Sequence, residues 1–198
     1  MRNAVLTGIG GQGTVLAAKV LAQAAQSRGW QVRTAETIGM AQRGGSVVSH
    51  VRMGDAGERV HAPLVPRGCA DVLIAFEPGE AARVAELVRP DGVLVSASRA
   101  INPVGASLAG GAYEAAPVLD ALAKAHPGRF VAVDEAAVLA AVGSAKALNM
   151  VLLAAAAHTG ALGLSLDELK DAVRACVKPR FVEMNLAAMD AAVQALEA

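Results

Sequence analysis

The N-terminal stretch Ala4-Val5-Leu6-Thr7-Gly8-Ile9-Gly10-Gly11-Gln12-Gly13 decides the fold class. Its first half is a short apolar run, which is typical of a buried parallel strand. Its glycine-rich second half leads into residues 14–28, whose Ala and Leu content predicts a helix. Gly29 stands where a glycine commonly ends a helix, and residues 31–36 predict a second strand. This order predicts a βαβ unit and therefore an α/β protein.

The rest of the chain continues this alternation and then becomes helical. Continuous apolar runs predict three more strands, over residues 71–76, 93–96 and 130–134. Helices are predicted over residues 80–88, 117–125, 146–161, 165–177 and 179–196, with a capping box at Ser165-x-x-Glu168. We therefore expect a three-layer α/β/α fold with a mostly parallel sheet. We expect one domain over residues 1–198, with a helical C-terminal part over residues 135–198.

Residues 36–52 gather varied polar side chains in a chain that is otherwise mostly aliphatic. Residues 46–53 alternate with a strand period and place Ser46, Val48, His50 and Arg52 on one side. Residues 54–57 predict a turn, after which residues 58–64 could return antiparallel. The sequence therefore predicts a β-hairpin near residues 46–64.

The motif Gly8-x-Gly10-x-x-Gly13, which encloses Gly11 and Gln12, is a candidate anion site. Backbone N–H groups at a helix start attract anions, and glycines let a phosphate approach closely. Glu36 ends the second strand slightly beyond the roughly 20-residue spacing of a ribose-binding acid, so dinucleotide binding is one interpretation. Gln12 is unusual in such a motif, and the glycines can equally serve a tight strand-to-helix crossing without a ligand.

The polar face of the predicted strand is a second candidate site. Ser46, His50 and Arg52 share that face, and Arg43 lies in the turn before them. Together they could bind a carboxylate, a phosphate or a thioester-carrier group. Alternatively, they form a hydrogen-bonded cluster that fixes a loop or meets another subunit. No nucleophile or paired carboxylate stands at a recognisable spacing from His50, so we predict no catalytic residue.

Composition excludes several classes of function. The chain is 54% hydrophobic but only 3% aromatic, so small aliphatic side chains must build the core, and some apolar surface is expected to face a partner. Lys+Arg equals Asp+Glu at 18 each, which argues against nucleic-acid binding. No basic run indicates a membrane surface, and the longest apolar run is too short to span a bilayer.

The cysteines Cys69 and Cys176 are isolated in the sequence. Neither has a second cysteine or a histidine at metal-ligand spacing, so we predict no metal site in this chain. They are expected to be buried in a reducing compartment, and no signal peptide is expected. We therefore predict a cytoplasmic protein.

Four stretches carry a resemblance to a known family: Gly8-Ile-Gly-Gly-Gln-Gly13, Gly39-Met-Ala-Gln-Arg-Gly-Gly-Ser-Val-Val-Ser-His-Val-Arg52, Ala70-Asp-Val-Leu-Ile-Ala-Phe-Glu-Pro78 and Lys178-Pro-Arg-Phe-Val-Glu-Met-Asn185. Over almost its whole length the chain resembles the γ domain of 2-oxoacid:ferredoxin oxidoreductases. Within that family it is most similar to the β subunits of indolepyruvate ferredoxin oxidoreductases. The Gly-Met-Ala-Gln-Arg-Gly-Gly-Ser stretch is the most specific of these motifs.

The resemblance implies a larger α subunit that holds thiamine diphosphate, Mg and 4Fe-4S clusters. The complex would oxidatively decarboxylate a 2-oxoacid such as indolepyruvate, make an acyl-CoA and pass electrons to ferredoxin. This chain has neither cluster-binding cysteines nor a metal-dependent diphosphate motif, so we expect it to bind none of these cofactors and to be inactive alone.

The resemblance leaves two roles open for the polar segments. In the first, the glycine loop and Arg43 hold coenzyme A phosphates near the partner's thiamine site; its residues are Gly8, Gly10, Gly11, Gln12, Gly13 and Arg43. In the second, the polar cluster is an interface that closes the partner's active-site cleft; its residues are Glu36, Met40, Gln42, Ser46, His50 and Arg52. The alternatives are a free-standing, Rossmann-like nucleotide-binding protein and an assembly module without arylpyruvate chemistry.

Overall fold

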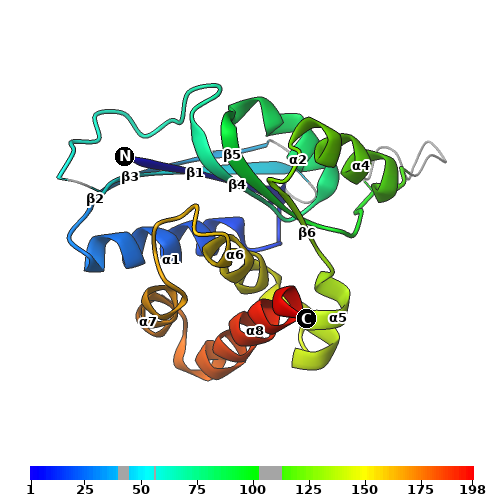
Figure 1. Cartoon of the computed structure of the whole chain (residues 1–198). Coiled ribbons are helices and arrows are strands. Elements are labelled where there is room, and N and C mark those ends of the chain that lie inside the picture. The colour runs from blue at the N-terminus through cyan, green and yellow to red at the C-terminus, as the bar shows by residue number, and fades with distance from the viewer. Residues whose placement is uncertain (40–44, 56, 103–112) are drawn as a thin grey trace.

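A computed structural model describes residues 1–39, 45–55, 57–102 and 113–198 (Figure 1). All the strands lie within residues 2–133, with helices between some of them, and the described residues after 133 form only helices and loops. The elements are β1 (Arg2–Ile9), α1 (Thr14–Ser27), β2 (Gln31–Ile38), β3 (Ser46–Gly54), β4 (Ala70–Ala75), α2 (Pro78–Val84), η1 (Ala85–Leu87), β5 (Val88–Ala97), α4 (Ala115–Ala125), β6 (Phe130–Val133), α5 (Glu135–Val142), η2 (Ala145–Ala147), α6 (Leu148–His158), α7 (Leu166–Cys176) and α8 (Pro179–Glu197).

The strands form one six-stranded sheet in the order β2-β3-β1-β4-β5-β6. β4 is parallel to β1 and β5, and β6 is parallel to β5. β3 is antiparallel to both of its neighbours, β1 and β2. Figure 1 shows α1 and α5 to α8 on one face of the sheet and α2 and α4 on the other. The predicted three-layer α/β/α class with a mostly parallel sheet is therefore confirmed, whereas a single domain over residues 1–198 stays a prediction.

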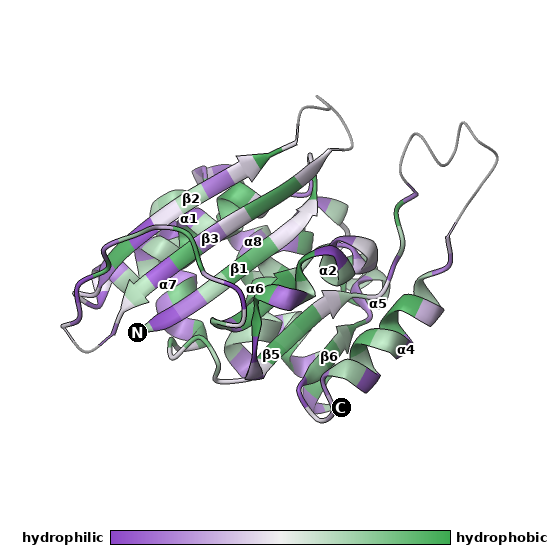
Figure 2. Ribbon diagram, turned by 90° about the horizontal axis from the view of Figure 1, so that it is seen from above, coloured by the Kyte–Doolittle hydropathy of each residue, from purple (hydrophilic) through white to green (hydrophobic). Residues whose placement is uncertain are grey.

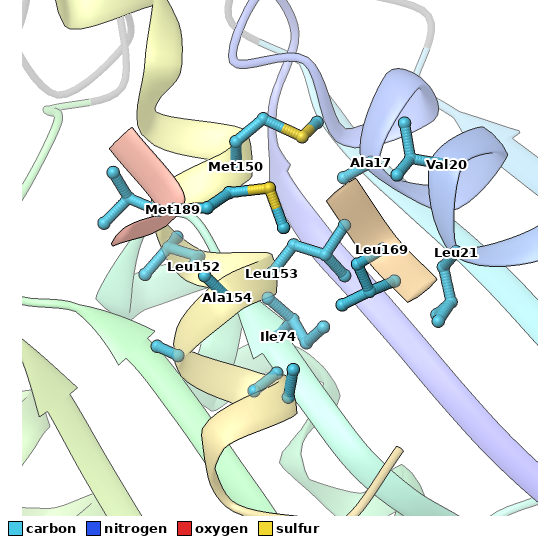
Figure 3. Close-up of a cluster of buried hydrophobic side chains, with 14 of the residues drawn as sticks. Ala17, Val20, Leu21, Ile74, Met150, Leu152, Leu153, Ala154, Leu169 and Met189 are labelled. Carbon is cyan, nitrogen blue, oxygen red and sulfur yellow. The ribbon is translucent and has the colours of Figure 1, made fainter. Parts of the chain in front are cut away.

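The larger core lies between the sheet and the C-terminal helices. In α6, every residue from Asn149 to Ala157 is buried, so this helix is the centre of its layer. Figure 3 shows Met150 of α6 beside Met189 of α8, and Leu153 of α6 directed toward Leu169 of α7. Small side chains along α6 let the sheet and the outer helices approach it closely. A smaller cluster under α2 and α4 covers the other face.

The predicted hairpin near residues 46–64 is only half right. Its first strand is confirmed as β3, but the return over residues 58–64 is wrong, because no strand occurs there. β3 already has β1 and β2 as neighbours, which leaves it no free edge. The hairpin in this region is the antiparallel pair β2 and β3. Figure 2 shows hydrophilic and hydrophobic residues interspersed along both strands.

Candidate functional site

A cleft of about 680 Å³ opens where β1, β4, β5 and β6 end. In open α/β sheets, ligands bind in the crevice outside the carboxyl ends of the strands. The cleft is lined by the loop after β1, the ends of β4 and β5, and the starts of α5 and α6. Its residues are Gly11, Gln12, Gly13, Leu16, Phe76, Arg99, Ala100, Ile101, Glu135, Ala136, Leu139, Ala145, Lys146, Leu148 and Asn149.

The glycine loop is held in shape by the side chain of Gln12. Its Oε1 accepts a hydrogen bond from Ile9 N at 2.6 Å, and its Nε2 donates to Phe76 O at 2.8 Å. A Cβ on Gly8 would lie 2.7 Å from that Oε1 and 2.9 Å from Phe76 Cβ. Gln12, the unusual residue of the motif, therefore joins β1 to the end of β4. Position 8 requires glycine, because Gln12 and Phe76 lie too close to it for a larger residue.

Two helices, α1 and α6, begin at the cleft. Gly13, at φ 84°, is the N-cap of α1, and Ala147 is the N-cap of α6; neither forms a side-chain capping hydrogen bond, although Asn149 Oδ1 accepts from Met150 N at 3.0 Å in the first turn of α6. Uncapped backbone N–H groups at a helix start carry partial positive charge and favour anions. Asn149 of α6 donates to Gly13 O at 3.4 Å, which joins the two helix starts.

Side-chain charge in the cleft also favours anions. Arg99 and Lys146 line the cleft and are exposed, whereas Glu135 is 4% exposed. The Glu135 carboxylate accepts hydrogen bonds from Ser98 N at 2.8 Å, Ser98 Oγ at 3.0 Å and Arg99 N at 3.1 Å. These donors occupy both oxygens of the Glu135 carboxylate, so it is not free to bind a ligand. The side chains of Arg99 and Lys146 line the cleft. The arrangement suits a phosphate or carboxylate group.

Comparison with known proteins agrees with this architecture. Residues 3–195 match the sequence profile described as pyruvate ferredoxin/flavodoxin oxidoreductase. The chain belongs to that family. Over 197 residues it is 36% identical to indolepyruvate oxidoreductase subunit IorB of Thermococcus kodakarensis, covering 98% of this chain and 95% of the relative. The predicted family resemblance is thereby confirmed, and the chain is a small subunit of a 2-oxoacid:ferredoxin oxidoreductase.

Two solved structures of ferredoxin oxidoreductases share the fold. The γ subunit of the keto/oxoacid ferredoxin oxidoreductase of Geobacter sulfurreducens matches with a TM-score of 0.70 and 24% identity, over 100% of both chains. The 2-oxoglutarate:ferredoxin oxidoreductase of Magnetococcus marinus, with 2-oxoglutarate, coenzyme A and succinyl-CoA bound, matches with a TM-score of 0.70 and 20% identity. There the match covers 98% of this chain and 31% of that one. The fold therefore occurs both as a separate subunit and as part of a longer chain.

The residues predicted to contact CoA fall into three groups. Gly11, Gln12 and Gly13 line the cleft. Gly8 lies beneath the loop, and Gly10 N donates to Gly45 O at 2.9 Å. Arg43 lies outside the described residues, as do Met40 and Gln42. The sequence did not single out Arg99, Glu135, Lys146 or Asn149, since each stands alone after a strand or at a helix start and belongs to no local motif.

The polar residues of β3 do not converge on one point. Ser46 Oγ is hydrogen-bonded to Glu80 of α2. His50 Nδ1 accepts from Val65 N at 3.2 Å, and burial lowers the pKa of this histidine. Arg52 donates to Asn3 Oδ1 at 3.0 Å and to Ala62 O at 2.9 Å. His50 and Arg52 thus fasten the connection between β3 and β4 to the sheet, whereas Ser46 joins β3 to α2.

Glu36 lies away from the glycine loop. It is exposed on β2 and lines a separate groove of about 290 Å³ between β2 and α1, together with Lys19 and Thr34. β3 lies between β2 and β1, so Glu36 does not share the cleft with the glycines. Glu36 is therefore not placed to act as the ribose-binding acid of a dinucleotide site beside the loop.

Metal and membrane features are limited in the described part of the chain. Among the described residues, no three or more His, Cys, Asp or Glu side chains are grouped so that they could hold a metal ion. Cys69 is exposed, contrary to the expectation of burial, and Cys176 is half-buried. None of the described helices is both long and apolar enough to cross a membrane.

Proposed function

We propose that this chain is the cofactor-free subunit of an indolepyruvate ferredoxin oxidoreductase, in which it helps to bind coenzyme A. The near full-length similarity to a protein named indolepyruvate oxidoreductase subunit supports the arylpyruvate substrate. The complex would release the 2-oxoacid carboxylate as carbon dioxide, join the remaining acyl group to the sulfur of CoA, and pass the electron pair to ferredoxin. A cytoplasmic location stays part of this proposal.

The redox cofactors do not fit the described residues of this chain. Cys69 precedes β4 and Cys176 ends α7, and two cysteines cannot supply the ligands of a four-cysteine iron–sulfur cluster. The described carboxylates offer no group of metal ligands for a diphosphate-bound Mg²⁺. We therefore assign thiamine diphosphate, Mg²⁺ and 4Fe-4S clusters to the larger partner subunit, and expect this chain to be inactive alone.

The main observation that supports CoA binding is the cationic cleft at the ends of the strands. It brings together the glycine loop, the starts of α1 and α6, and the side chains of Arg99 and Lys146. CoA carries several phosphate groups, and such groups bind to helix starts and to Arg or Lys side chains. Arg99 and Lys146 therefore join Arg43 as candidate phosphate ligands.

Kinetics of the reconstituted complex test this role. We expect Arg99→Ala and Lys146→Ala each to raise the KM for CoA by about tenfold, with the KM for indolepyruvate little changed. Arg67→Ala is the matched control, because this arginine precedes β4, its side chain is 79% exposed and it does not line the cleft. An unchanged KM for CoA in both cleft variants, with normal assembly, would refute CoA binding in this cleft.

The nucleotide-binding alternative has its own test on the isolated chain. NAD, NADP and CoA are titrated in parallel by calorimetry. Tight binding of a nicotinamide cofactor, with no affinity for a larger subunit, would overturn the oxidoreductase-subunit proposal. The position of Glu36 outside the cleft leads us to expect no such binding.

A further inference from the structure

The segment after β5, residues 98–101, is held from two sides by buried carboxylates. Glu135, the first residue of α5, accepts hydrogen bonds from Ser98 N, Ser98 Oγ and Arg99 N at 2.8, 3.0 and 3.1 Å. Glu77, the N-cap of α2, accepts from Ile101 N at 3.4 Å and from Glu80 N at 2.9 Å. β4 and β6 flank β5, so each neighbouring strand delivers one carboxylate to the segment between them.

Such an arrangement is unexpected beside a cleft that suits anions. Glu77 and Glu135 are 2% and 4% exposed, and a buried carboxylate is costly unless hydrogen bonds satisfy it. A negative charge at the cleft wall also weakens the binding of an anionic ligand. The hydrogen bonds from residues 98–101 offset part of the burial cost, so the carboxylates and this segment hold one another in place.

We infer that Glu135 is a positioning residue, which fixes the backbone of Ser98 and Arg99 and thereby sets the Arg99 guanidinium in the cleft to receive a phosphate group of the ligand. The ligand's identity as CoA rests on the proposed function. Glu135 does not contact the ligand in this account, because its oxygens are occupied by the three donors of Ser98 and Arg99. Glu135 therefore changes the affinity for the ligand by positioning Arg99.

Glu135→Gln separates positioning from simple electrostatics. The glutamine has nearly the same size, but one carboxylate oxygen becomes an NH₂ group that faces an N–H donor instead of accepting from it. If Glu135 were only a negative charge near the ligand, removing the charge would strengthen CoA binding. Positioning predicts the opposite, a KM for CoA raised by about tenfold with kcat little changed, because charge-assisted hydrogen bonds are lost.

The experiment uses the reconstituted complex with Glu135→Gln, Arg99→Ala and the double variant. If Glu135 acts through Arg99, the double variant is no worse than Arg99→Ala within about twofold. Asp134→Asn is the matched control, since Asp134 caps α5 through Ala137 N at 3.3 Å and does not hold residues 98–101. Ser98→Ala, which loses one bond to Glu135, is the milder variant if Glu135→Gln assembles poorly, with an expected increase of about threefold.

A lowered or unchanged KM for CoA in Glu135→Gln, or effects that multiply in the double variant, would overturn the inference. Hydrogen exchange of the peptide over residues 96–101 tests the anchoring without CoA. Exchange should be faster in Glu135→Gln than in the wild type and in Asp134→Asn; equal exchange would also overturn the inference. An unchanged KM for CoA in Arg99→Ala alone would also overturn the inference, whereas an unchanged KM in both Arg99→Ala and Lys146→Ala would instead refute CoA binding in this cleft.

Discussion

At the scale of single residues, Gly13 and Gly29 bracket α1 and form a natural pair for comparison. Both have positive φ, 84° and 83°, where any other L-residue is strained. A Cβ on Gly13 would lie 2.6 Å from Asn149 Nδ2, whereas a Cβ on Gly29 would meet nothing within 4 Å. Asn149 is 3% exposed and has little room to move. The contact between α1 and α6 therefore restricts Gly13 in a way that backbone conformation alone does not.

We expect Gly29→Ala to lower the free energy of unfolding by about 1 kcal/mol, from backbone strain alone. Gly13→Ala should cost about 3 kcal/mol, because overpacking against Asn149 adds to the same strain. Chemical denaturation of both variants measures the difference. Combining Gly13→Ala with Asn149→Ala should recover part of the loss, and equal costs for the two glycine variants would contradict the packing argument.

His50 gives the second prediction at this scale. Burial lowers the pKa of this histidine from its ordinary value of 6.5, and its Nδ1 must be unprotonated to accept from Val65 N. The unfolded chain therefore binds more protons than the folded chain as the pH falls below about 6.5, so stability falls with the pH through that window. His50→Asn keeps an acceptor near the Nδ1 position but does not titrate.

Denaturant unfolding of wild type and His50→Asn between about pH 7.5 and 5 measures this contribution. The wild type should lose stability on acidification more steeply than the variant. The same slope in both would show that His50 does not couple protonation to folding. A lower overall stability of the variant is expected from its smaller side chain and does not bear on the slope.

At the scale of secondary-structure elements, α6 carries the packing of the C-terminal layer. Leu153 is fully buried in the core that α6 shares with α1, α7 and α8 (Figure 3). We expect Leu153→Ala to lower the free energy of unfolding by about 3 kcal/mol, because it leaves a cavity among three helices. Leu64→Ala is the control, since Leu64 is 54% exposed and its removal should cost less than about 0.5 kcal/mol. The stabilities of the two variants are compared by thermal and denaturant unfolding.

The same scale shows what the sequence could predict. Apolar runs such as residues 71–76 predicted the central strands, because strands buried on both faces leave few polar residues. The capping box at Ser165 and Glu168 is present as predicted, since it depends only on local spacing. The partner of β3 was predicted wrongly because strand pairing is a non-local choice. The turn residues over 54–57 suggested a return over residues 58–64, whereas β1 and β2 already occupied both edges of β3.

At the scale of the whole molecule, the site is assembled from distant parts of the chain. Gly13, Phe76, Arg99, Glu135 and Asn149 each follow a strand or begin a helix, and only the parallel strand directions bring them to one edge. Only the glycine loop carried a local sequence signal, so it was the only part of the cleft predicted. The polar stretch around β3 carried the strongest motif, yet its described side chains mainly fasten the β3–β4 connection to the sheet.

The balance of charges should make self-association of the isolated chain depend on pH. With 18 basic and 18 acidic residues and a sequence pI near 6.9, copies of the chain repel one another least close to pH 7. A chain that is 54% hydrophobic then has little electrostatic protection against association. We expect light scattering at low salt to be strongest near pH 7 and to fall toward about pH 5.5 and pH 8.5. Replacing the exposed Arg67 and Lys124 with Glu should move this maximum to lower pH. A maximum that stays near pH 7 in that variant would show that a fixed apolar surface, rather than net charge, governs the association.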